Sequence, residues 1–460
     1  MKKVVYLLIL LLFVSCSKTN LVKSIENDCE YLKQILPDAS IDFSNAVDAG
    51  LDVEAFINEV KLRYANYAEN DRKDKYEKPD ENGIYNSAFT DAITYTLQNH
   101  LKRKNTHMTI KGKYAYIAHS YVNRVFLSDI FFEKNGDDFF VLRDFNSEIS
   151  EGMKYTGDLE NIVLEYINGD FVYRFVFFSE KLSLDKAKIS LDNNTFIVPV
   201  RRDELVPRKG KDLWYEEKDG KLYVIASTFK PHLEKNIEDY EITLEEICEK
   251  INNYSTVVFD FRDNAGGYSD TFTPVITSML FGTSDYEAEL YDKIAENLIL
   301  AKTELLTETV RNSYLLDGQI LDYTYYGDKG IRYNTLKSEE ERFEIDTPAF
   351  NGKIFIITNT NTVSAAEMVI AELKYYFKDK VCILGEKSAG MLDFGGVFSY
   401  ILPDSKIRIN LCHVDNTGNA FLSVENGWKG DTKGFYPDYW IFEENSRDID
   451  GYIKNWKGIK

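Results

Sequence analysis

One segment constrains the fold of this chain more than any other. The apolar strand Thr256–Phe261 runs through a short polar turn into Gly266 and Gly267. Short runs of β-branched and aromatic residues are typical of buried strands. Paired glycines after such a strand let the backbone approach a ligand closely and present N–H groups to it. We therefore expect a central strand that ends in a binding or catalytic turn.

A second strand, about a hundred residues later, leads into a helix with a serine at the turn. The strand is Lys353–Thr358, and an amphipathic helix follows over Ala365–Phe377. Ser364 lies between them, and a serine at a strand–turn–helix junction is a common way to present a nucleophile. Ser364 and Glu367 also match the Ser-x-x-Glu pattern of a helix capping box, so a structural role is the alternative.

Periodicity divides the chain into parts. Strands and helices alternate in the second half, which indicates an α/β core. Helical spacing marks Leu51–Ala65 and Ser87–Leu101, and we expect a helical lid from the insertion within the core. Asn135-Gly136, Asn168-Gly169 and Asp219-Gly220 predict hairpin turns. The expected parts are a signal peptide at 1–15, a helical region at 16–105, a β-rich module at 106–220, an α/β core at 221–445 with the insertion at 283–340, and a tail at 446–460.

Three motifs, each behind a predicted strand, resemble those of one enzyme family. They are Asp260–Gly267, Ser364–Glu367 and Gly385–Gly390, and together they resemble the tail-specific (C-terminal processing) proteases, a family of serine peptidases. The resemblance implies a crotonase-like α/β core, a β-rich module that is a degenerate PDZ-like domain, a polypeptide substrate and no cofactor. For Asp260, Arg262 and Asn264, we expect a structural role in bracing the glycine turn.

The same resemblance assigns the nucleophile and the oxyanion hole. It implies that Ser364 attacks the peptide carbonyl. The N–H of Gly266 or Gly267, together with that of Ala365, would bind the developing oxyanion. The start of a helix at Ala365 would also favour negative charge on the reacting oxygen.

The base departs from the usual family pattern. Most members keep a lysine directly after Gly-Glu-x-x-x-Gly, but Met391 occupies that position here and cannot accept a proton. A second branch, which includes tricorn-like proteases, uses Ser, His and Glu. The segment Asn105–Ile110 resembles the histidine segment of that branch, which implies His107 as the base. His413 and a displaced dyad with Lys387 are the alternatives.

The glutamate of this branch lies just before a Gly-x-x-Pro-Asp segment. Here Glu425 precedes Gly434–Asp438, with Trp428–Lys433 as an apparent insertion. The resemblance therefore implies that Glu425 orients the histidine and stabilises the imidazolium. A solvated surface acid is the alternative for Glu425.

The N-terminus resembles a bacterial lipoprotein signal. Lys2 and Lys3 precede the apolar run Val4–Val14, which is too short to span a bilayer as a mature helix. Phe13–Cys16 then resembles a lipoprotein cleavage box, which implies a lipid anchor on Cys16 and a place in the cell envelope, outside the cytoplasm. An ordinary secretory signal is the alternative.

Charge and cysteine spacing exclude several classes of function. The formal net charge of −20 disfavours binding of nucleic acid or an anionic membrane through bulk charge. No Cys-x-x-Cys pair, metal-ligand spacing or nucleotide motif occurs, so we predict no metal. We expect an exported serine peptidase. A catalytically inactive peptide- or ligand-binding lipoprotein on the same fold is the alternative, and a hydrolase of small esters or lipids is a third.

Overall fold

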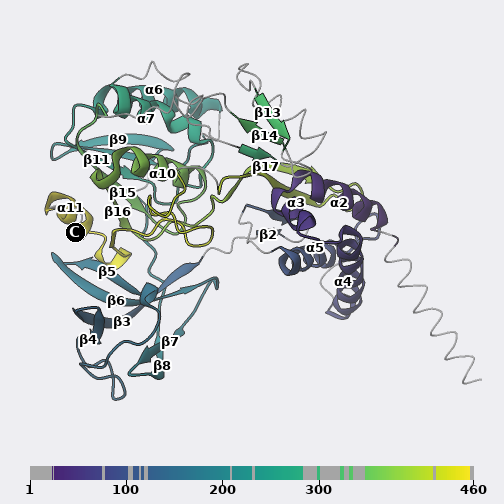
Figure 1. Ribbon diagram of the computed structural model, residues 1–460, viewed down its shortest axis with the longest axis horizontal. Helices are drawn as coiled ribbons and strands as arrows, with labels where there is room; N and C mark the ends of the chain where they lie inside the picture. Colours follow the sequence, from purple (N-terminus) through teal and green to yellow (C-terminus); the bar gives the residue numbers. More distant parts are fainter. Residues whose placement is uncertain are drawn as a thin grey trace, which may run out of the picture. The chain divides into compact units, whose positions relative to one another are not determined.

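The structure is a computed structural model, and its helices and strands fall into two compact units (Figure 1). Unit 1 comprises Met1–Ser120, Ala295–Glu340 and Asp393–Gly418, and unit 2 comprises Tyr121–Ile294, Glu341–Leu392 and Asn419–Lys460. The residues that the structure describes are 23, 25–74, 78–101, 107–112, 116–118, 123–207, 210–230, 234–282, 298–300, 322–325, 331–334, 348–417 and 421–455.

Unit 2 is built on a mixed sheet with the order β4-β3-β6-β5-β19-β16-β15-β11-β10-β9. Its central strands from β5 through β19, β16, β15 and β11 to β10 pair in parallel, and the strands at both ends pair antiparallel. The strands are β3 (Arg124–Asn135), β4 (Asp138–Val141), β5 (Ile162–Ile167), β6 (Asp170–Ser179), β9 (Leu213–Lys218), β10 (Lys221–Ala226), β11 (Thr256–Asp260), β15 (Lys353–Thr358), β16 (Val381–Gly385) and β19 (Tyr439–Trp440).

Helices cover both faces of the parallel strands (Figure 1). Three helices, α6 (Glu234–Ile251), α7 (Thr273–Phe281) and α10 (Ala365–Phe377), pack on the face that buries Val257 and Ile356. The other face carries α11 (Asp448–Asn455). Because parallel strands are buried on both sides, their sequences are almost continuously apolar. Unit 2 is thus an α/β unit, as the alternation of elements predicts.

The elements around the glycine turn and Ser364 follow the sequence prediction closely. β15 and α10 have the predicted bounds, and β11 ends one residue before the predicted Phe261. Hairpins form at Asn168-Gly169 and Asp219-Gly220, where both residues of each pair have positive φ. Asn and Gly tolerate that conformation, which fits the right-handed twist of the strands. Asn135-Gly136 likewise lies between β3 and β4.

The β-rich segment extends the core sheet. β5 pairs in parallel with β19 through Glu165 and Trp440, which makes the β-rich strands part of one sheet with the core. The fully buried Arg174 donates to Glu165 (3.0 Å) and Asp129 (2.8 Å), so the buried charges are paired. The hairpin of β7 (Lys186–Leu191) and β8 (Asn194–Pro199) forms a separate sheet.

In the described part of unit 1, four helices pack on a second sheet. The helices bury apolar residues of β1 and β18, among them Ile110 and Ile409. The sheet order is β13-β14-β12-β18-β1-β2, and β17 pairs with β18. The elements are α2 (Glu26–Ala39), α3 (Ile41–Asp48), α4 (Val53–Asp74), α5 (Asn86–His100), β1 (Thr109–Lys111), β2 (Tyr116–Ala118), β12 (Leu298–Leu300), β13 (Asp322–Tyr325), β14 (Ile331–Asn334), β17 (Phe394–Ile401) and β18 (Arg408–Asp415).

The division of the chain differs from the expected parts in three places. β1 and β2 lie in unit 1 rather than in the β-rich module, because β1 pairs with β18. The described residues of 283–340 are strands rather than a helical lid, because β12 and β14 continue the unit 1 sheet. The expected tail contains α11, whose Ile449 and Ile453 are buried against the core.

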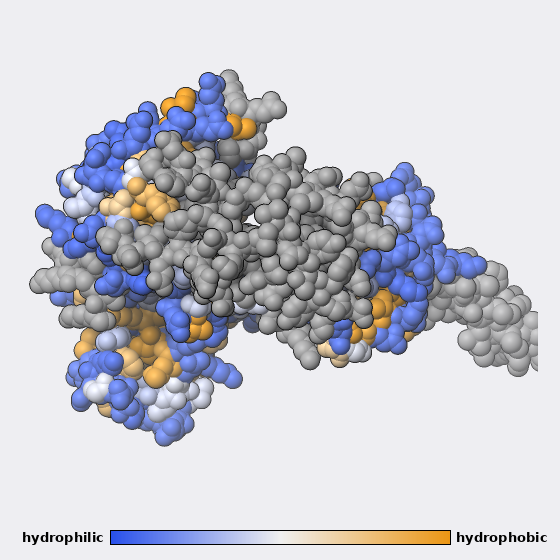
Figure 2. Space-filling view, turned by 45° about the horizontal axis from the view of Figure 1, so that its top comes forward, coloured by the Kyte–Doolittle hydropathy of each residue, from blue (hydrophilic) through white to orange (hydrophobic). Residues whose placement is uncertain are grey.

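The surface and the N-terminus bear on the expected location. Among the described residues, no helix combines the length and the apolar character that crossing a membrane requires. The predicted signal and Cys16 lie outside the described residues. Figure 2 shows hydrophilic residues over much of the described surface, with apolar residues gathered on the β-rich part of unit 2. Exposed apolar side chains on the β-rich part include Leu142, Leu159, Phe171, Leu182 and Ile197.

Candidate active site

The glycine turn follows β11 and is held by the side chain of Asn264. The amide Nδ2 of Asn264 donates to the carbonyl of Ala226 (2.9 Å), and its Oδ1 accepts the N–H of Gly266 (2.9 Å). The carbonyl of Asn264 accepts the N–H of Val363 (3.0 Å), which ties this turn to the one after β15. Arg262 also forms a buried pair with Asp260. The predicted bracing of the glycine turn is therefore seen for Asn264, whereas Asp260 and Arg262 bond each other, and Arg262 also donates to the Val206 carbonyl (2.6 Å).

Ser364 forms a sharp junction between β15 and α10. Its backbone has φ 55° and ψ −121°, a conformation that is strained for a residue with a side chain. Such a strained strand-to-helix turn carries the serine in nucleophile elbows. The capping interaction is also present, since Glu367 accepts the N–H of Ser364 (3.1 Å). Both predicted roles of this turn are thus compatible with the structure.

The glycine turn lies directly against Ser364. A Cβ placed on Gly266 would come within 2.9 Å of the Ser364 Cβ and 3.1 Å of the Ala365 N. Only glycine permits this approach, and its φ of 77° is also in the left-handed region. The fold therefore joins two motifs that are about a hundred residues apart, because β11 and β15 are adjacent parallel strands.

Two backbone N–H groups of this junction have no acceptor among the described residues. In the described part of the chain, no group accepts a hydrogen bond from the N–H of Gly267 or Ala365, whereas Gly266 N–H is engaged by Asn264. The first N–H groups of a helix have no intrahelical partner. Of the predicted oxyanion donors, Gly267 and Ala365 are therefore free to donate, and Gly266 provides the close approach.

Glu367 connects the nucleophile turn to the third motif. Its carboxylate is fully buried and accepts four hydrogen bonds. Oε2 accepts the N–H groups of Ser364 (3.1 Å) and Met391 (2.8 Å), and Oε1 accepts Gly390 N–H (2.7 Å) and the Ser388 hydroxyl (2.5 Å). The N–H groups of Ser364 and Met391 thus bond to the same carboxylate oxygen. Met391 occupies the position of the lysine in most family members, so this position lies beside the candidate nucleophile. The capping pattern predicted the first of these bonds, but the others depend on tertiary structure.

Lys387 is buried beside Glu367, and backbone carbonyls surround its ammonium group. Its Nζ donates to the carbonyls of Ser388 (2.7 Å), Ala389 (3.3 Å) and Thr432 (3.3 Å). An ammonium group has three N–H donors, so these contacts use all of them. Burial lowers the pKa of Lys387 to about 7, and burial raises the pKa of Glu367. Lys387 therefore braces the Gly385–Gly390 loop.

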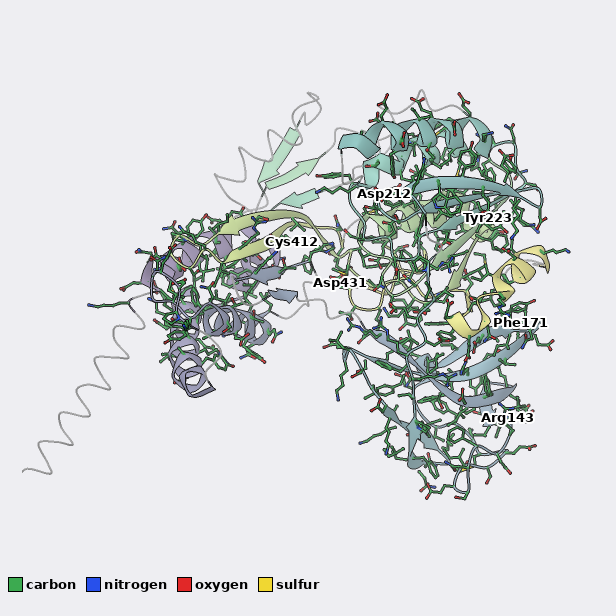
Figure 3. The ribbon with its side chains drawn as sticks, turned by 180° about the vertical axis from the view of Figure 1, so that it is seen from behind. Arg143, Phe171, Asp212, Tyr223, Cys412 and Asp431 are labelled. Carbon is green, nitrogen blue, oxygen red and sulfur yellow. The ribbon has the colours of Figure 1, made fainter. Side chains whose placement is uncertain are left out.

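Residues that the sequence prediction left without a role hold the two turns together. The Nδ2 of Asn359 donates to Asp263 Oδ1 (2.7 Å), and its Oδ1 accepts the Asp263 N–H (3.0 Å). Asn361 donates to the same Asp263 oxygen (2.9 Å). Clusters of Asn and Asp after strand ends commonly bond nearby backbone, and that signal could have identified these residues. Asp431, labelled in Figure 3, similarly accepts the N–H of Leu392 (2.8 Å).

His107 lies two residues before β1, in unit 1, whereas Ser364 lies in unit 2. Burial lowers the pKa of His107 to about 4. The imidazole is therefore neutral over the physiological pH range, and a base must be neutral to accept a proton. The role of His107 as the base stays a prediction.

Glu425 lies at the far end of α10 from Ser364. It is an exposed residue of a turn in which a Cβ on Gly427 would lie 3.3 Å from the Lys374 Cε. Phe421, at the start of the same turn, packs on Tyr375 with ring centroids 5.0 Å apart. Lys374 is nine residues after the first residue of α10, or about 14 Å along the axis. The turn therefore lies beside the distal part of α10, and the role of Glu425 in orienting the histidine stays a prediction.

The other histidines give no competing base in the described residues. His100 bonds Glu59 (2.8 Å) at the end of α5, and the side chain of His413 on β18 is not among those described. His119 and His232 lie outside the described residues. The described cysteines are Cys29, Cys248, Cys382 and Cys412, of which Figure 3 labels Cys412; all four are buried, and none forms a disulfide with another described residue. Among the described side chains, no group of three or more His, Cys, Asp or Glu residues could hold a metal ion.

Comparison with known proteins supports a relation to one peptidase family. Residues 222–439, which include all three motifs, match the family described as peptidase family S41. This region of the chain is therefore S41-like, and the match supports a peptidase. No curated protein matches the chain.

Solved structures of low identity are also similar. Mature CPAF complexed with lactacystin is 14% identical, with 94% of this chain and 97% of that chain covered and a TM-score of 0.43. A photosystem II D1 C-terminal processing protease is 14% identical, with 91% and 94% covered and a TM-score of 0.35. A putative S41 protease from Bacteroides fragilis NCTC 9343 is 18% identical, with 72% and 80% covered and a TM-score of 0.30. At these values the likenesses do not bear on the roles of single residues.

Proposed function

We propose that this protein is a serine peptidase with Ser364 as its nucleophile. The Ser364 oxygen bonds to the peptide carbonyl carbon, and its proton passes to His107. The N–H groups of Gly267 and Ala365 bind the oxyanion. The C–N bond then breaks, and His107 returns the proton to the leaving amine. Water hydrolyses the acyl-enzyme by the same steps, so no cofactor is required.

One observation carries this proposal. The strained Ser364 and the glycine turn meet at the carboxyl ends of two parallel strands, beside two N–H donors that have no acceptor among the described residues. A helix cap alone needs neither the strain nor the close approach of Gly266. The match of residues 222–439 to peptidase family S41 supports the same reaction.

Sequence and charge state support His107 as the base in this proposal. Met391 cannot accept a proton, and Lys387 directs its three N–H groups to carbonyls. His107 is held neutral and lies in the segment that resembles the tricorn-like branch. Glu425 is left out of the proposed proton transfer because its turn lies beside the distal part of α10.

The finer features predicted from the sequence complete the proposal. We infer a crotonase-like core, a degenerate PDZ-like module in the β-rich segment, and export to the bacterial cell envelope. A lipid on Cys16 would anchor the protein to the membrane. A Cys16→Ala variant that stays in the membrane fraction, like the unaltered protein, would contradict the anchor.

Labelling with a fluorophosphonate probe tests the reaction class. We expect the probe to label the unaltered protein and not Ser364→Ala, with folding of the variant checked by circular dichroism. Losing a helix cap costs about 0.5–2 kcal/mol, which a chain of this size should tolerate. Ser423→Ala is the matched control, because Ser423 accepts the Asn426 N–H (3.1 Å) in the turn at the other end of α10.

The outcomes separate the alternatives. A folded protein that neither reacts with the probe nor cleaves peptides would favour an inactive binding protein. Probe labelling together with cleavage of small esters, but not of peptides, would favour an ester or lipid hydrolase. Labelling that persists in Ser364→Ala would exclude Ser364 as the nucleophile.

A further inference from the structure

An exposed lysine and an exposed tyrosine lie next to Gly267 of the glycine turn. Tyr268 directly follows Gly267, and 58% of its surface is exposed. The Nζ of Lys230 lies 5.4 Å from the centroid of the Tyr268 ring, within the range of a cation–π contact. Lys230 is itself exposed. The pair therefore presents a positive charge and an aromatic face to solvent beside the candidate oxyanion donor.

The backbone that carries this pair is fixed. Phe229 is fully buried, its N–H donates to the Gly266 carbonyl (2.9 Å), and its carbonyl accepts the N–H of Tyr268 (3.2 Å). The hydroxyl of Thr271 donates to the same carbonyl (3.1 Å). A Cβ on Gly267 would lie 2.7 Å from the Lys230 N, so the two segments touch. Rigid anchoring of this kind lowers the entropic cost of binding a ligand.

Among the lysines of unit 2 that lie over an aromatic ring, Lys218 and Lys250 have an acidic partner, whereas Lys134, Lys230 and Lys429 have none among the described residues. Lys218 lies over Tyr223 and pairs with Asp450 (2.5 Å), and Lys250 lies over Tyr215 and also has a carboxylate partner. In the described part of the chain, no carboxylate lies within ion-pair distance of the Lys230 ammonium. A cation that no described carboxylate balances can pair with a carboxylate of a ligand.

The pair lies within reach of a substrate bound at Ser364. Gly266 contacts Ser364, and Tyr268 is two residues further on, or at most about 7.6 Å from Gly266 between Cα atoms. An extended peptide advances roughly 3.3 Å per residue, so a substrate residue a few positions from the scissile bond can reach the pair.

We propose that Lys230 and Tyr268 form a subsite for a carboxylate of the peptide substrate. The ammonium pairs with the carboxylate, and the tyrosine ring packs against the substrate chain that carries it. The carboxylate comes from an acidic side chain or from a free C-terminus near the scissile bond. This inference rests on the proposed function for the identity of the substrate, but binding can be measured without turnover.

Titration of fluorescein-labelled peptides into the Ser364→Ala protein tests the subsite. The peptides share one sequence and carry either Asp or Asn at each of the four positions on either side of a central residue, with a free or amidated C-terminus. We expect roughly fivefold tighter binding of at least one carboxylate peptide than of its neutral partner, and a smaller ratio at high salt. The additional change Lys230→Glu should remove the preference, and Lys230→Arg should keep it.

Lys134→Glu is the matched control, and the peptide pairs distinguish the two sources of carboxylate. Lys134 also lies over an aromatic ring, that of Phe139 (5.7 Å), but on β3, so Lys134→Glu should leave the preference unchanged. A preference that amidation removes identifies a C-terminus, and one that Asn removes identifies a side chain. Equal binding of charged and neutral peptides, or a preference that survives Lys230→Glu, would overturn the subsite. Failure of the probe to label Ser364 in the unaltered protein would instead overturn the proposed reaction.

Discussion

Helix α10 begins and ends with the same strained backbone, but its two ends are built differently. Ser364 before the helix has φ 55° and ψ −121°, and Lys378 after it has φ 50° and ψ −121°. The N-terminal end is braced by buried hydrogen bonds that Glu367 accepts, and it contacts Gly266. The C-terminal end is exposed at Lys378 and packed by apolar groups such as Tyr375 and Phe421.

This difference teaches what identifies a candidate site. A strained residue alone does not, because Lys378 has the same backbone angles as Ser364. The N-terminal end adds a buried carboxylate that accepts four hydrogen bonds, a glycine in close contact and two N–H groups that have no acceptor among the described residues. Such bracing holds reacting groups in a fixed geometry, whereas apolar packing contributes stability without positioning them.

The largest expected effect concerns the proton acceptor that the N-terminal end requires. We expect His107→Ala to lower kcat/KM by about 10²–10⁴-fold, the usual contribution of a general base. A base must be unprotonated, so activity is present above its pKa and is lost below it. With His107 as the base, activity should fall only as the pH drops towards about 4, because burial lowers the pKa of this imidazole.

The pH profile distinguishes His107 from Lys387. Burial lowers the pKa of Lys387 to about 7, so a lysine base would make activity rise with pH through about 7. The rate of fluorophosphonate labelling between pH 4 and pH 9 measures this without a known substrate. His100→Ala is the control, since His100 pairs with Glu59. If His107→Ala is labelled at the full rate, and that rate rises with pH through about 7, the base is Lys387 instead.

The next effect compares two glycines, one at each end of α10. Gly266 (φ 77°) and Gly427 (φ 86°) both have left-handed backbone, so alanine at either costs roughly 1–2 kcal/mol of folding free energy. The added Cβ would meet the Ser364 Cβ and the Val363 carbonyl at 2.9 Å in Gly266→Ala. In Gly427→Ala it would meet the flexible Lys374 at 3.3 Å and Phe435 at an ordinary 4.0 Å. We expect labelling to fall about a hundredfold in the first variant alone.

Thermal unfolding and labelling of both glycine variants make this comparison quantitative. Similar melting temperatures with very different labelling rates would support a site at the N-terminal end. Equal losses of labelling in the two variants would show that the effect is one of stability, and labelling of Gly266→Ala at the normal rate would contradict the proposed contact.

At the N-terminal end of α10, the sequence predicted the strands, the helix and the turns better than the hydrogen bonds that connect them. Strand β15, helix α10 and the turn residues of β11 follow from local periodicity and turn chemistry. The three further donors to Glu367 come from residues 388–391, which local patterns cannot place. The same limit explains β1, whose Thr109 accepts a hydrogen bond from Asn410 (2.7 Å) some 300 residues away.

A smaller effect is expected from the carboxylate that braces Ser364. Glu367→Gln keeps the shape of the side chain but replaces one acceptor oxygen with an NH₂ group. Because this group faces N–H donors, it leaves buried donors without an acceptor. We expect a loss of about 1–3 kcal/mol in unfolding free energy and a fall of roughly tenfold in kcat, with KM little changed. Chemical denaturation and steady-state kinetics measure the two quantities. An unchanged kcat would show that Glu367 only caps the helix.

Glu372→Gln is the matched control on the same helix. Burial raises the pKa of Glu372 to about 8, so the carboxyl is protonated at pH 7 and glutamine preserves its charge. In the unaltered protein the folded state binds this proton more tightly than the unfolded state, so stability should fall as the pH rises from about 5 to 8. Glu372→Gln should keep its activity and show a weaker fall.

The smallest effect is expected at the C-terminal end, from Glu425→Gln. Glu425 is exposed, and its turn lies beside Lys374, so removal of its charge should leave kcat/KM within about twofold and the melting temperature unchanged. The resemblance to tricorn-like proteases implied the opposite, with this glutamate orienting the histidine. A tenfold or greater fall in kcat/KM, together with a shift in the acidic limb of the pH profile, would restore that role. A fall in stability without such a shift would place Glu425 in the packing of the turn, because only an orienting carboxylate changes the affinity of the base for its proton.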